Sequence, residues 1–299
     1  MKIVVTHASP DWDAISSVWL IKKFLKNWEN AKVVFVPAGD RVKGSKAHET
    51  QKVIEKIGED EVIHVDTGMG PLDHHQTDDM SVCGASRTWD YVKSEHEGND
   101  RWLLKADAIE RIVNIIVAID HFQEVYWCDA SADYQEFSLL GILEGLKYQK
   151  PGEDEYYMLF GMECLDALVS DFENRAWAEK EIKEKGKEFT TQWGKGLGVE
   201  TMNDTILKLA QKMGYSVVIR KDPRSGFVRI KTLPIHAGSR EEKSPNFTLL
   251  YEKLSKMDPD ATWYLHVSKK MLLNGTSKNP NMIPTKLSLD DIIKVVKEV

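Results

Sequence analysis

Three short apolar runs within the first 65 residues constrain the fold more than any other feature of this sequence. They are compact and rich in β-branched residues, which is typical of buried strands: Lys2–Thr6 (KIVVT), Lys32–Val36 (KVVFV) and Glu61–Val65 (EVIHV). Between them, Ala14–Leu25 has near-helical apolar spacing with Asp13 as the expected N-cap, and Ala47–Ile57 is expected to form a second helix. Strands that alternate with helices in this way predict an α/β fold with a parallel sheet and right-handed crossovers.

The remaining sequence predicts a helical second half of this first domain, followed by a smaller domain. Helices are expected around Cys83–His96, Trp102–Ile119, Ala130–Leu146 and Glu155–Lys187. Trp193–Val199 (WGKGLGV) contains three glycines and is interpreted as a hinge or linker. We therefore predict an N-terminal domain over residues 1–195 and a small α/β domain over residues 200–299. The elements expected in the small domain are strands Ser216–Arg220, Phe227–Thr232 and Thr262–Val267 and helices Asn246–Met257 and Leu289–Val299.

Composition and charge narrow the range of partners. The formal net charge of −7 disfavours broad binding to duplex DNA, although metal ions and local basic side chains could still attract a short anionic substrate. The three cysteines, Cys83, Cys128 and Cys164, are widely spaced, which favours reduced thiols over a disulfide or a zinc site. The sequence shows no signal-peptide pattern and no apolar run near the ~18 residues of a membrane span. We expect a soluble, cytoplasmic protein that does not bind membranes.

Residues of the kinds that bind metal ions follow two of the predicted strands. The first group is His7, Asp11 and Asp13, directly after the first strand, and the second begins with Asp66, directly after the third. The loop that follows Asp66 adds Asp73-His74-His75. Ligands of open parallel sheets bind beyond the carboxyl ends of the strands, so neighbouring strand ends would bring these groups into one crevice. Such a concentration favours metal binding over an ordinary polar loop.

Mixed imidazole and carboxylate ligands suit transition-metal ions, and Mn²⁺ is the first choice. The alternatives are Co²⁺, Zn²⁺ and the oxygen-preferring ion Mg²⁺. Clustered carboxylates would repel each other without a counter-charge. Two divalent ions ~3.5–4 Å apart can share a bridging carboxylate, bind a phosphoryl oxygen and lower the pKa of a water molecule. The residue types therefore predict a site with two divalent metal ions and phosphoester chemistry.

The pattern H-x3-D-x-D, then D-x-G and then D-H-H, in this order, resembles the DHH phosphoesterase superfamily over roughly the first 80 residues. That superfamily includes RecJ-type exonucleases, oligonucleotide and cyclic-dinucleotide phosphodiesterases, and manganese-dependent inorganic pyrophosphatases. The resemblance implies a DHH-type catalytic domain in which His7 and Asp11 bind one metal ion and Asp13 and His74 bind the other. It further implies that Asp66 bridges the two ions.

The same resemblance implies three more roles. A fourth acidic ligand is expected from a later helix, and Asp120 is the candidate, although it could also be an acidic residue that ends a helix. His75 is expected to contact the scissile phosphate, with Asp73 orienting a ligand, so that His75, Asp66 and Asp73 form the catalytic set. Trp12 lies between two expected ligands, where it could pack the loop against the helix or stack on a base.

The second domain departs from the superfamily pattern, because it has no G-G-G-H loop. The nearest feature is a basic stretch followed by a glycine, from which we predict substrate binding by His266, Lys269, Lys270, Asn274 and Gly275. Lysines such as Lys269, Lys270 and Lys278 are ordinary solvated side chains about as often as they bind phosphate.

The function predicted from these features is metal-dependent hydrolysis of a phosphoester in a nucleotide or short oligonucleotide. Inorganic pyrophosphatase is the alternative within the same chemistry, and it would favour a dense lysine and arginine cluster in the second domain. A different alternative is a non-catalytic sensor that binds metal and a nucleotide. Retention of every expected ligand in the first three motifs argues against the sensor.

Overall fold

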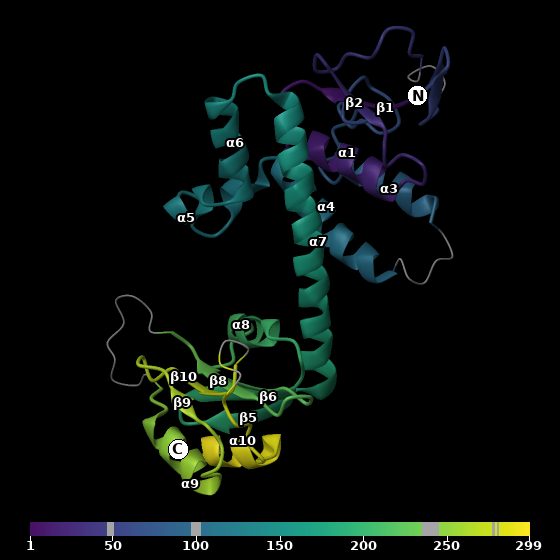
Figure 1. Cartoon of the computed structure of the whole chain (residues 1–299). Coiled ribbons are helices and arrows are strands. Elements are labelled where there is room, and N and C mark those ends of the chain that lie inside the picture. Colours follow the sequence, from purple (N-terminus) through teal and green to yellow (C-terminus); the bar gives the residue numbers. More distant parts are fainter. Residues whose placement is uncertain (47–50, 97–102, 235–244, 277–278, 280) are drawn as a thin grey trace. The chain divides into compact units, whose positions relative to one another are not determined.

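In the computed structural model, the chain forms two compact units, Met1–Glu173 and Asn174–Val299. The structure describes residues 1–46, 51–96, 103–234, 245–276, 279 and 281–299 (Figure 1). The division falls within α7 (Asp154–Lys185), so one continuous helix carries the chain from the first unit into the second. Each unit combines a β-sheet with helices, and the first contains parallel strands, which confirms the predicted α/β class.

The first unit is built on a four-stranded sheet in the order β2-β1-β4-β3. Its strands are β1 (Lys2–His7), β2 (Lys32–Val36), β3 (Glu55–Ile57) and β4 (Asp60–His64). Strand β1 runs parallel to both β2 and β4, with Val5 opposite Val34 on one side and His64 on the other. The carboxyl ends of β1 and β4 therefore lie side by side at one edge of the sheet, as the sequence predicted.

The helices of the first unit enclose one large apolar core. They are α1 (Trp12–Phe24), α3 (Gly84–Ser94), α4 (Leu103–Asp120), the short α5 (Asp133–Glu136), α6 (Leu139–Gln149) and the first part of α7, with a 3₁₀ turn at Gln123–Tyr126. Helices α1, α3 and α4 pack against one another and place Ile15, Trp19, Trp89 and Ile109 in the core. Full burial of such side chains stabilises a fold by about 1.5–3 kcal/mol each. This packing holds the amino end of α1 and the carboxyl end of α4 near the sheet edge.

The second unit has a six-stranded sheet in the order β5-β6-β7-β8-β10-β9. Its elements are β5 (Lys187–Thr191), β6 (Gly194–Glu200), α8 (Thr205–Lys212), β7 (Val217–Lys221), β8 (Val228–Thr232), α9 (Thr248–Met257), β9 (Tyr264–Leu265), β10 (Met271–Asn274) and α10 (Leu289–Lys297). Among the described strands of this unit, only β6 and β7 pair in parallel. Alternate residues of β7 face opposite sides: Val217 packs with α9 and α10, whereas Val218 packs with α8. The predicted smaller α/β domain is thus present as a three-layered unit.

Two segments fold differently from the sequence prediction. The helix expected over Ala47–Ile57 is wrong over the described part, because Glu55–Ile57 forms β3 and pairs antiparallel with β4. A two-residue connection through Gly58, whose φ is +64°, closes this hairpin. Residues 47–50, including His48, lie outside the described residues.

The hinge expected at Trp193–Val199 is also wrong, because these residues form most of β6, between β5 and β7. The glycines there allow close packing: a Cβ on Gly196 would lie 2.3 Å from the Phe189 ring, and one on Gly198 would lie 2.8 Å from Ile293. Elsewhere in the second unit, the strand expected over Thr262–Val267 shortens to β9, and α8 and β10 were not predicted. None of the helices in the described ranges combines the length and apolar character that a membrane crossing requires.

Candidate metal centre

The first part of the site is the connection between β1 and α1. His7 ends β1, and Asp11 is the N-cap of α1, where its Oδ1 accepts hydrogen bonds from the backbone N–H groups of Asp13 and Ala14, both at 3.0 Å. The expectation that Asp13 would be the N-cap is wrong, because Asp13 lies inside the first turn and its side chain is used elsewhere. The other oxygen of Asp11, Oδ2, lies 3.7 Å from His7 Nε2.

The His7 ring has the orientation of a metal-binding imidazole. Its Nδ1 lies 2.9 Å from the carbonyl oxygen of Ala8, and because a carbonyl can only accept, we assign the proton to Nδ1. Nε2 then faces Asp66 Oδ2 at 3.3 Å and Asp11 Oδ2 at 3.7 Å, and its lone pair becomes available to a metal ion when the ring loses its second proton. A backbone acceptor that fixes the tautomer in this way is the usual partner of a metal-binding histidine. Burial opposes a charge on His7, but the carboxylates of Asp11 and Asp66 outweigh it and raise its pKa to about 11.

Asp13 is held from the opposite side by the amino end of α3. The backbone N–H groups of Gly84 and Ala85 donate to its two oxygens at 2.7 and 2.6 Å. Those N–H groups have no partner within the helix and lie at the positive end of its dipole, so they favour a carboxylate there. Gly84 permits this contact, because a Cβ at this position would lie 2.8 Å from Asp66 Cβ and 2.9 Å from Asp13 Oδ2. Sequence reasoning did not single out Gly84; the only signal was a glycine at the start of the helix after the D-H-H loop.

Asp66 lies in a sharply turned loop after β4. Its backbone has a left-handed φ of +50°, and its N–H donates to the carbonyl of Leu72 at 2.9 Å. The half-buried Arg41 supports the loop by donating to the carbonyl of Gly68. Arg41 also pairs with the carboxylate of Glu55 at 3.2 Å. This supporting arginine was not predicted.

His64 belongs to the same buried network. Its Nε2 accepts from the backbone N–H of Val42 at 3.2 Å, and its Nδ1 lies 3.5 Å from Glu55 Oε2. Burial and the nearby Arg41 charge lower the pKa of His64 to about 4. The residue is therefore a neutral acceptor that helps to hold the segment beneath the Asp66 loop.

The D-H-H segment presents its two histidines differently. Asp73 is buried, and it accepts hydrogen bonds from the backbone N–H groups of Met69 at 2.6 Å and His75 at 3.1 Å. The His75 ring also donates its Nδ1–H to Asp73 at 2.7 Å, while the side chain remains 56% exposed. Burial alone would raise the pKa of Asp73, but the hydrogen bonds from His75 and Met69 together have the larger effect and lower it below its ordinary value. His75 Nε2 is thus left available, whereas His74 turns inward.

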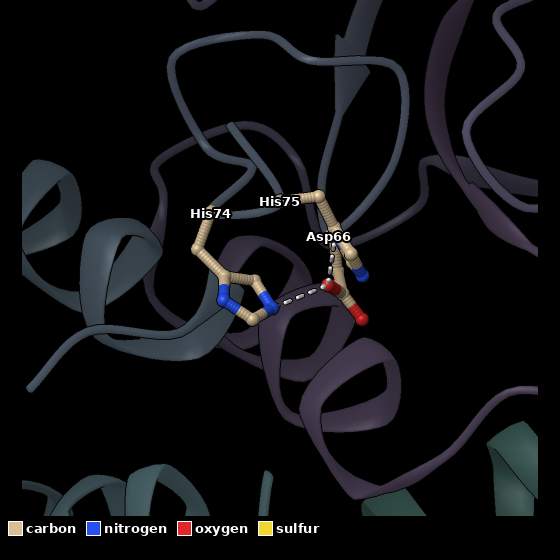
Figure 2. Close-up of side chains that lie close together, drawn as sticks. All are labelled: Asp66, His74 and His75. Carbon is tan, nitrogen blue, oxygen red and sulfur yellow. Dashed lines mark ion pairs between the residues drawn. The ribbon is translucent and has the colours of Figure 1, made fainter. Parts of the chain in front are cut away.

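His74 Nε2 is the point on which three carboxylates converge. It lies 3.6 Å from Asp13 Oδ2, 3.6 Å from Asp66 Oδ1 and 3.4 Å from Asp120 Oδ2. Figure 2 shows His74 and His75 with the Asp66 carboxylate between them. Asp120 is the last residue of α4 and lies mostly buried, so the end of this helix delivers the acidic group that the sequence suggested.

The residues present fit a bound cation. His74 Nε2, Asp66 Oδ1 and Asp120 Oδ2 are buried, and none has a hydrogen-bond partner among the described residues. Buried polar atoms without partners are costly and uncommon, and their convergence on one point indicates a ligand that accepts all three lone pairs. Imidazole nitrogen and carboxylate oxygen are a suitable donor set for a divalent transition-metal ion.

The pKa shifts of the acidic side chains also indicate a bound cation. Burial, with added repulsion from Asp11, raises the pKa of Asp66 to about 7 even though His7 lowers it. Burial and the neighbouring charges of Asp66 and Asp120 likewise raise the pKa of Asp13 well above its ordinary value. Burial also raises the pKa of Asp120. These carboxylates therefore disfavour their shared negative charge until a cation compensates it.

Three overlapping sets of side chains could each hold a metal ion: His7, Asp11 and Asp66; Asp66, His74 and His75; and His74, Asp120 and His121. These sets contain five of the six residues predicted as metal ligands, and the sixth, Asp13, lies 3.6 Å from His74 Nε2. His121 donates its Nε2–H to the carbonyl of Val82 at 2.8 Å, so this nitrogen is occupied and His121 supports the site instead.

The residues predicted to bind substrate lie in the second unit. His266, Lys269 and Lys270 lie in the turn between β9 and β10, where the Lys270 ammonium donates to the carbonyl of Pro245. Asn274 is fully buried: its amide donates to the carbonyls of Thr262 and Ile283, both at 2.9 Å, and accepts from the Thr285 N–H at 2.7 Å.

Asn274 therefore has no amide hydrogen left for a substrate, which argues against its predicted binding role. Gly275 has a φ of +93°, and a Cβ there would lie 2.0 Å from the Phe227 ring, which gives the glycine a packing role. Lys278 lies outside the described residues.

No protein-family model and no curated protein matches the chain. Among solved structures, the chain is similar to the pGpG-specific phosphodiesterase PggH from Vibrio cholerae. The two share 15% sequence identity, and the alignment covers 99% of this chain and 97% of that chain with a TM-score of 0.30. This likeness is too distant to indicate the chemistry of the chain.

Proposed function

We propose that the chain is a metal-dependent phosphoesterase that hydrolyses a phosphoester of a nucleotide or a short oligonucleotide at a site with two divalent cations. The observation that carries this proposal is the placement of Asp66. One of its oxygens faces His7 at 3.3 Å, and the other faces the unpartnered His74 nitrogen at 3.6 Å. Asp66 is therefore common to two adjacent ligand sets, which is the arrangement that a bridging carboxylate requires.

His7, Asp11 and Asp66 would hold one cation, and His74, Asp13, Asp120 and Asp66 would hold the other. When bound, the cations would polarise phosphoryl oxygens and lower the pKa of a water molecule. Mn²⁺ is the first choice, because the site mixes imidazole and carboxylate donors. Binding would also offset the burial and the mutual repulsion that raise the pKa of Asp66 and Asp13.

The protein's own contribution is to place and orient the reacting groups. The buried Asp73 carboxylate fixes the His75 ring through Nδ1 and leaves Nε2 to contact a phosphoryl oxygen, as a donor when both ring nitrogens carry a proton. The amino end of α3 keeps Asp13 in place through two short hydrogen bonds. Arg41 holds the Asp66 loop from below.

Inorganic pyrophosphatase receives less support than nucleotide hydrolysis. The basic residues that could form a cationic cluster in the second unit are partly neutralised: Arg220 and Arg229 both pair with Asp204, at 3.0 and 2.5 Å, and Arg220 also pairs with Asp222 at 3.1 Å. Arg240 lies outside the described residues. A dense group of uncompensated cations is the feature that pyrophosphate would favour.

The test combines metal analysis with one substrate panel. Protein loaded with Mn²⁺ is assayed against pyrophosphate, a cyclic dinucleotide, a linear dinucleotide, short single-stranded DNA and RNA, and a nucleoside bisphosphate. Asp66→Asn should abolish turnover and reduce bound metal, because the bridge serves both cations. Asp78→Asn, an exposed acid of the same loop, is the matched control and should leave both unchanged.

Elemental analysis should find two equivalents of metal in the wild-type protein. Bound metal without turnover of any substrate would refute the hydrolase and favour a non-catalytic binding protein. Full activity in Asp66→Asn would refute the proposed bridge.

A further inference from the structure

A second feature of the first unit is an apolar cavity of about 260 Å³ enclosed by α1, α4, α6 and α7. Trp12 forms its wall on α1, and Ile115, Ile116 and Ile119 form its wall on α4. Leu168 of α7 and Trp127 complete it, with Trp127 still 40% exposed. The walls are almost entirely hydrocarbon and aromatic, unlike the charged metal centre.

Two residues of the cavity lining are chain neighbours of proposed metal ligands. Trp12 lies between the proposed ligands Asp11 and Asp13, and Ile119 immediately precedes Asp120. Consecutive Cα atoms are 3.8 Å apart, so the cavity walls and the ligands share the same short backbone segments. A molecule with a phosphate at the metal ions could therefore extend an apolar part toward this cavity.

One polar atom among the walls lacks a partner. The Trp12 side chain is only 5% exposed, and its Nε1–H has no hydrogen-bond partner among the residues that the structure describes. A buried indole N–H usually finds an acceptor. An occupant that brings an acceptor atom would satisfy the Trp12 N–H.

We propose that this cavity binds the base of the nucleotide whose phosphate lies at the metal centre, an inference that rests on the proposed function. A nucleobase has two flat faces for the apolar walls and a ring nitrogen or carbonyl oxygen that can accept from Trp12. Trp127 offers an aromatic surface, and stacking on such surfaces tolerates any base. The volume falls below the roughly 300–1,000 Å³ of pockets that enclose a complete drug-sized ligand, and so suits one ring system. Pyrophosphate offers nothing to such a cavity.

The test measures binding of adenosine, guanosine, cytidine and uridine to the full-length, Mn²⁺-loaded protein by calorimetry. Nucleosides carry no phosphate, so their binding is independent of hydrolysis. Ile115→Trp should fill the cavity from its half-exposed wall and weaken binding at least tenfold. Ile142→Trp is the matched control, because Ile142 is 44% exposed on α6 and lies outside the cavity lining, and it should bind as the wild type does.

Trp12→Phe keeps an aromatic ring and removes only the N–H, so it should weaken nucleoside binding roughly three- to tenfold, the effect of one hydrogen bond. Thermal unfolding of each variant reports whether it is folded. If no nucleoside binds at millimolar concentration, or if Ile115→Trp binds as well as Ile142→Trp, the base site is refuted.

The two proposals fail separately. Nucleoside binding that responds to Ile115→Trp, in a protein that hydrolyses no phosphoester, would leave the base site standing and refute the hydrolase. Hydrolysis without nucleoside binding would refute only the base site.

Discussion

Gly84 is the position at which one added methyl group should disturb the metal centre most directly. It is the first residue of α3, and its backbone N–H donates to Asp13 Oδ2 at 2.7 Å. A Cβ there would lie 2.8 Å from Asp66 Cβ, 3.1 Å from Asp66 Cα and 2.9 Å from Asp13 Oδ2. Neither neighbour is the free end of a flexible side chain, because Asp13 is fixed by hydrogen bonds and the Asp66 contacts involve its backbone and Cβ. Gly84→Ala must therefore move α3 away from both carboxylates.

The expected cost follows from this crowding. Overpacking of a well-packed interior costs about 1–3 kcal/mol, and alanine recovers at most ~1 kcal/mol of that through its helix propensity. Displacement of groups that orient metal ligands typically reduces metal affinity by about 10–100-fold. We thus expect Gly84→Ala to lose about 1–2 kcal/mol of unfolding free energy and at least tenfold in Mn²⁺ affinity.

Urea denaturation without metal and calorimetric titration with Mn²⁺ measure the two effects. The control is Gly145→Ala within α6, where a Cβ meets nothing within 4 Å. That substitution should leave Mn²⁺ affinity unchanged and stabilise the protein by about 0.5–1 kcal/mol. If Gly84→Ala matched the wild type in both affinity and stability, the close approach of α3 to Asp66 would be wrong.

Three further predictions concern different parts of the site. His75→Ala should keep its full metal content yet reduce turnover by roughly a hundredfold, since it removes one charge-stabilising donor; loss of a metal ion on elemental analysis would contradict this role. In the metal-free protein, burial raises the pKa of Asp66 from 3.8 to about 7. The folded state therefore holds this proton more tightly than the unfolded state does. The resulting stabilisation is complete below pH ~4 and is lost as the pH rises through ~7. Urea denaturation in a chelator should show stability falling across that window, with Mn²⁺ affinity rising across it because metal displaces the proton; a flat profile would argue against the burial of Asp66. Arg41→Met should cost about 1–3 kcal/mol, because Glu55 loses its charged partner but keeps the hydrogen bonds from Ser45 and Lys46. The Arg41→Met/Glu55→Met double variant should regain part of this in the same assay; a single variant as stable as the wild type would exclude the network as a support.

Much of the first unit could be predicted from the sequence, because the positions of the strands along the chain, and the residues at which they end, are local signals. The run KIVVT buries Val4 and Val5 on opposite faces, KVVFV is partly buried, and the positions of the two runs match β1 and β2 within one residue. The ligands could be found because they follow β1 and β4 directly, and parallel neighbours expose their carboxyl ends at one edge. His7 and Asp66 approach within 3.3 Å there, although they are 59 positions apart in the sequence.

Other features could not be predicted, because they depend on what packs against a segment. Ala47–Ile57 resembles a helix in composition, yet Glu55 is drawn into a hairpin where its buried carboxylate meets Arg41. The glycines of Trp193–Val199 suggest flexibility in isolation. In the sheet they accommodate neighbouring side chains, and the segment becomes the interior strand β6.

The sequence by itself determined the type, order and approximate location of the groups that would bind metal, since these follow from residue chemistry and spacing along the chain. Only the tertiary structure decided how they are held. Asp120 approaches His74 because α4 ends at that point, and Asp13 faces the amino end of α3 because Gly84 lets the helix come close. Both contacts join segments that are distant along the chain, and such proximity arises from helix packing in the core, which no local pattern records.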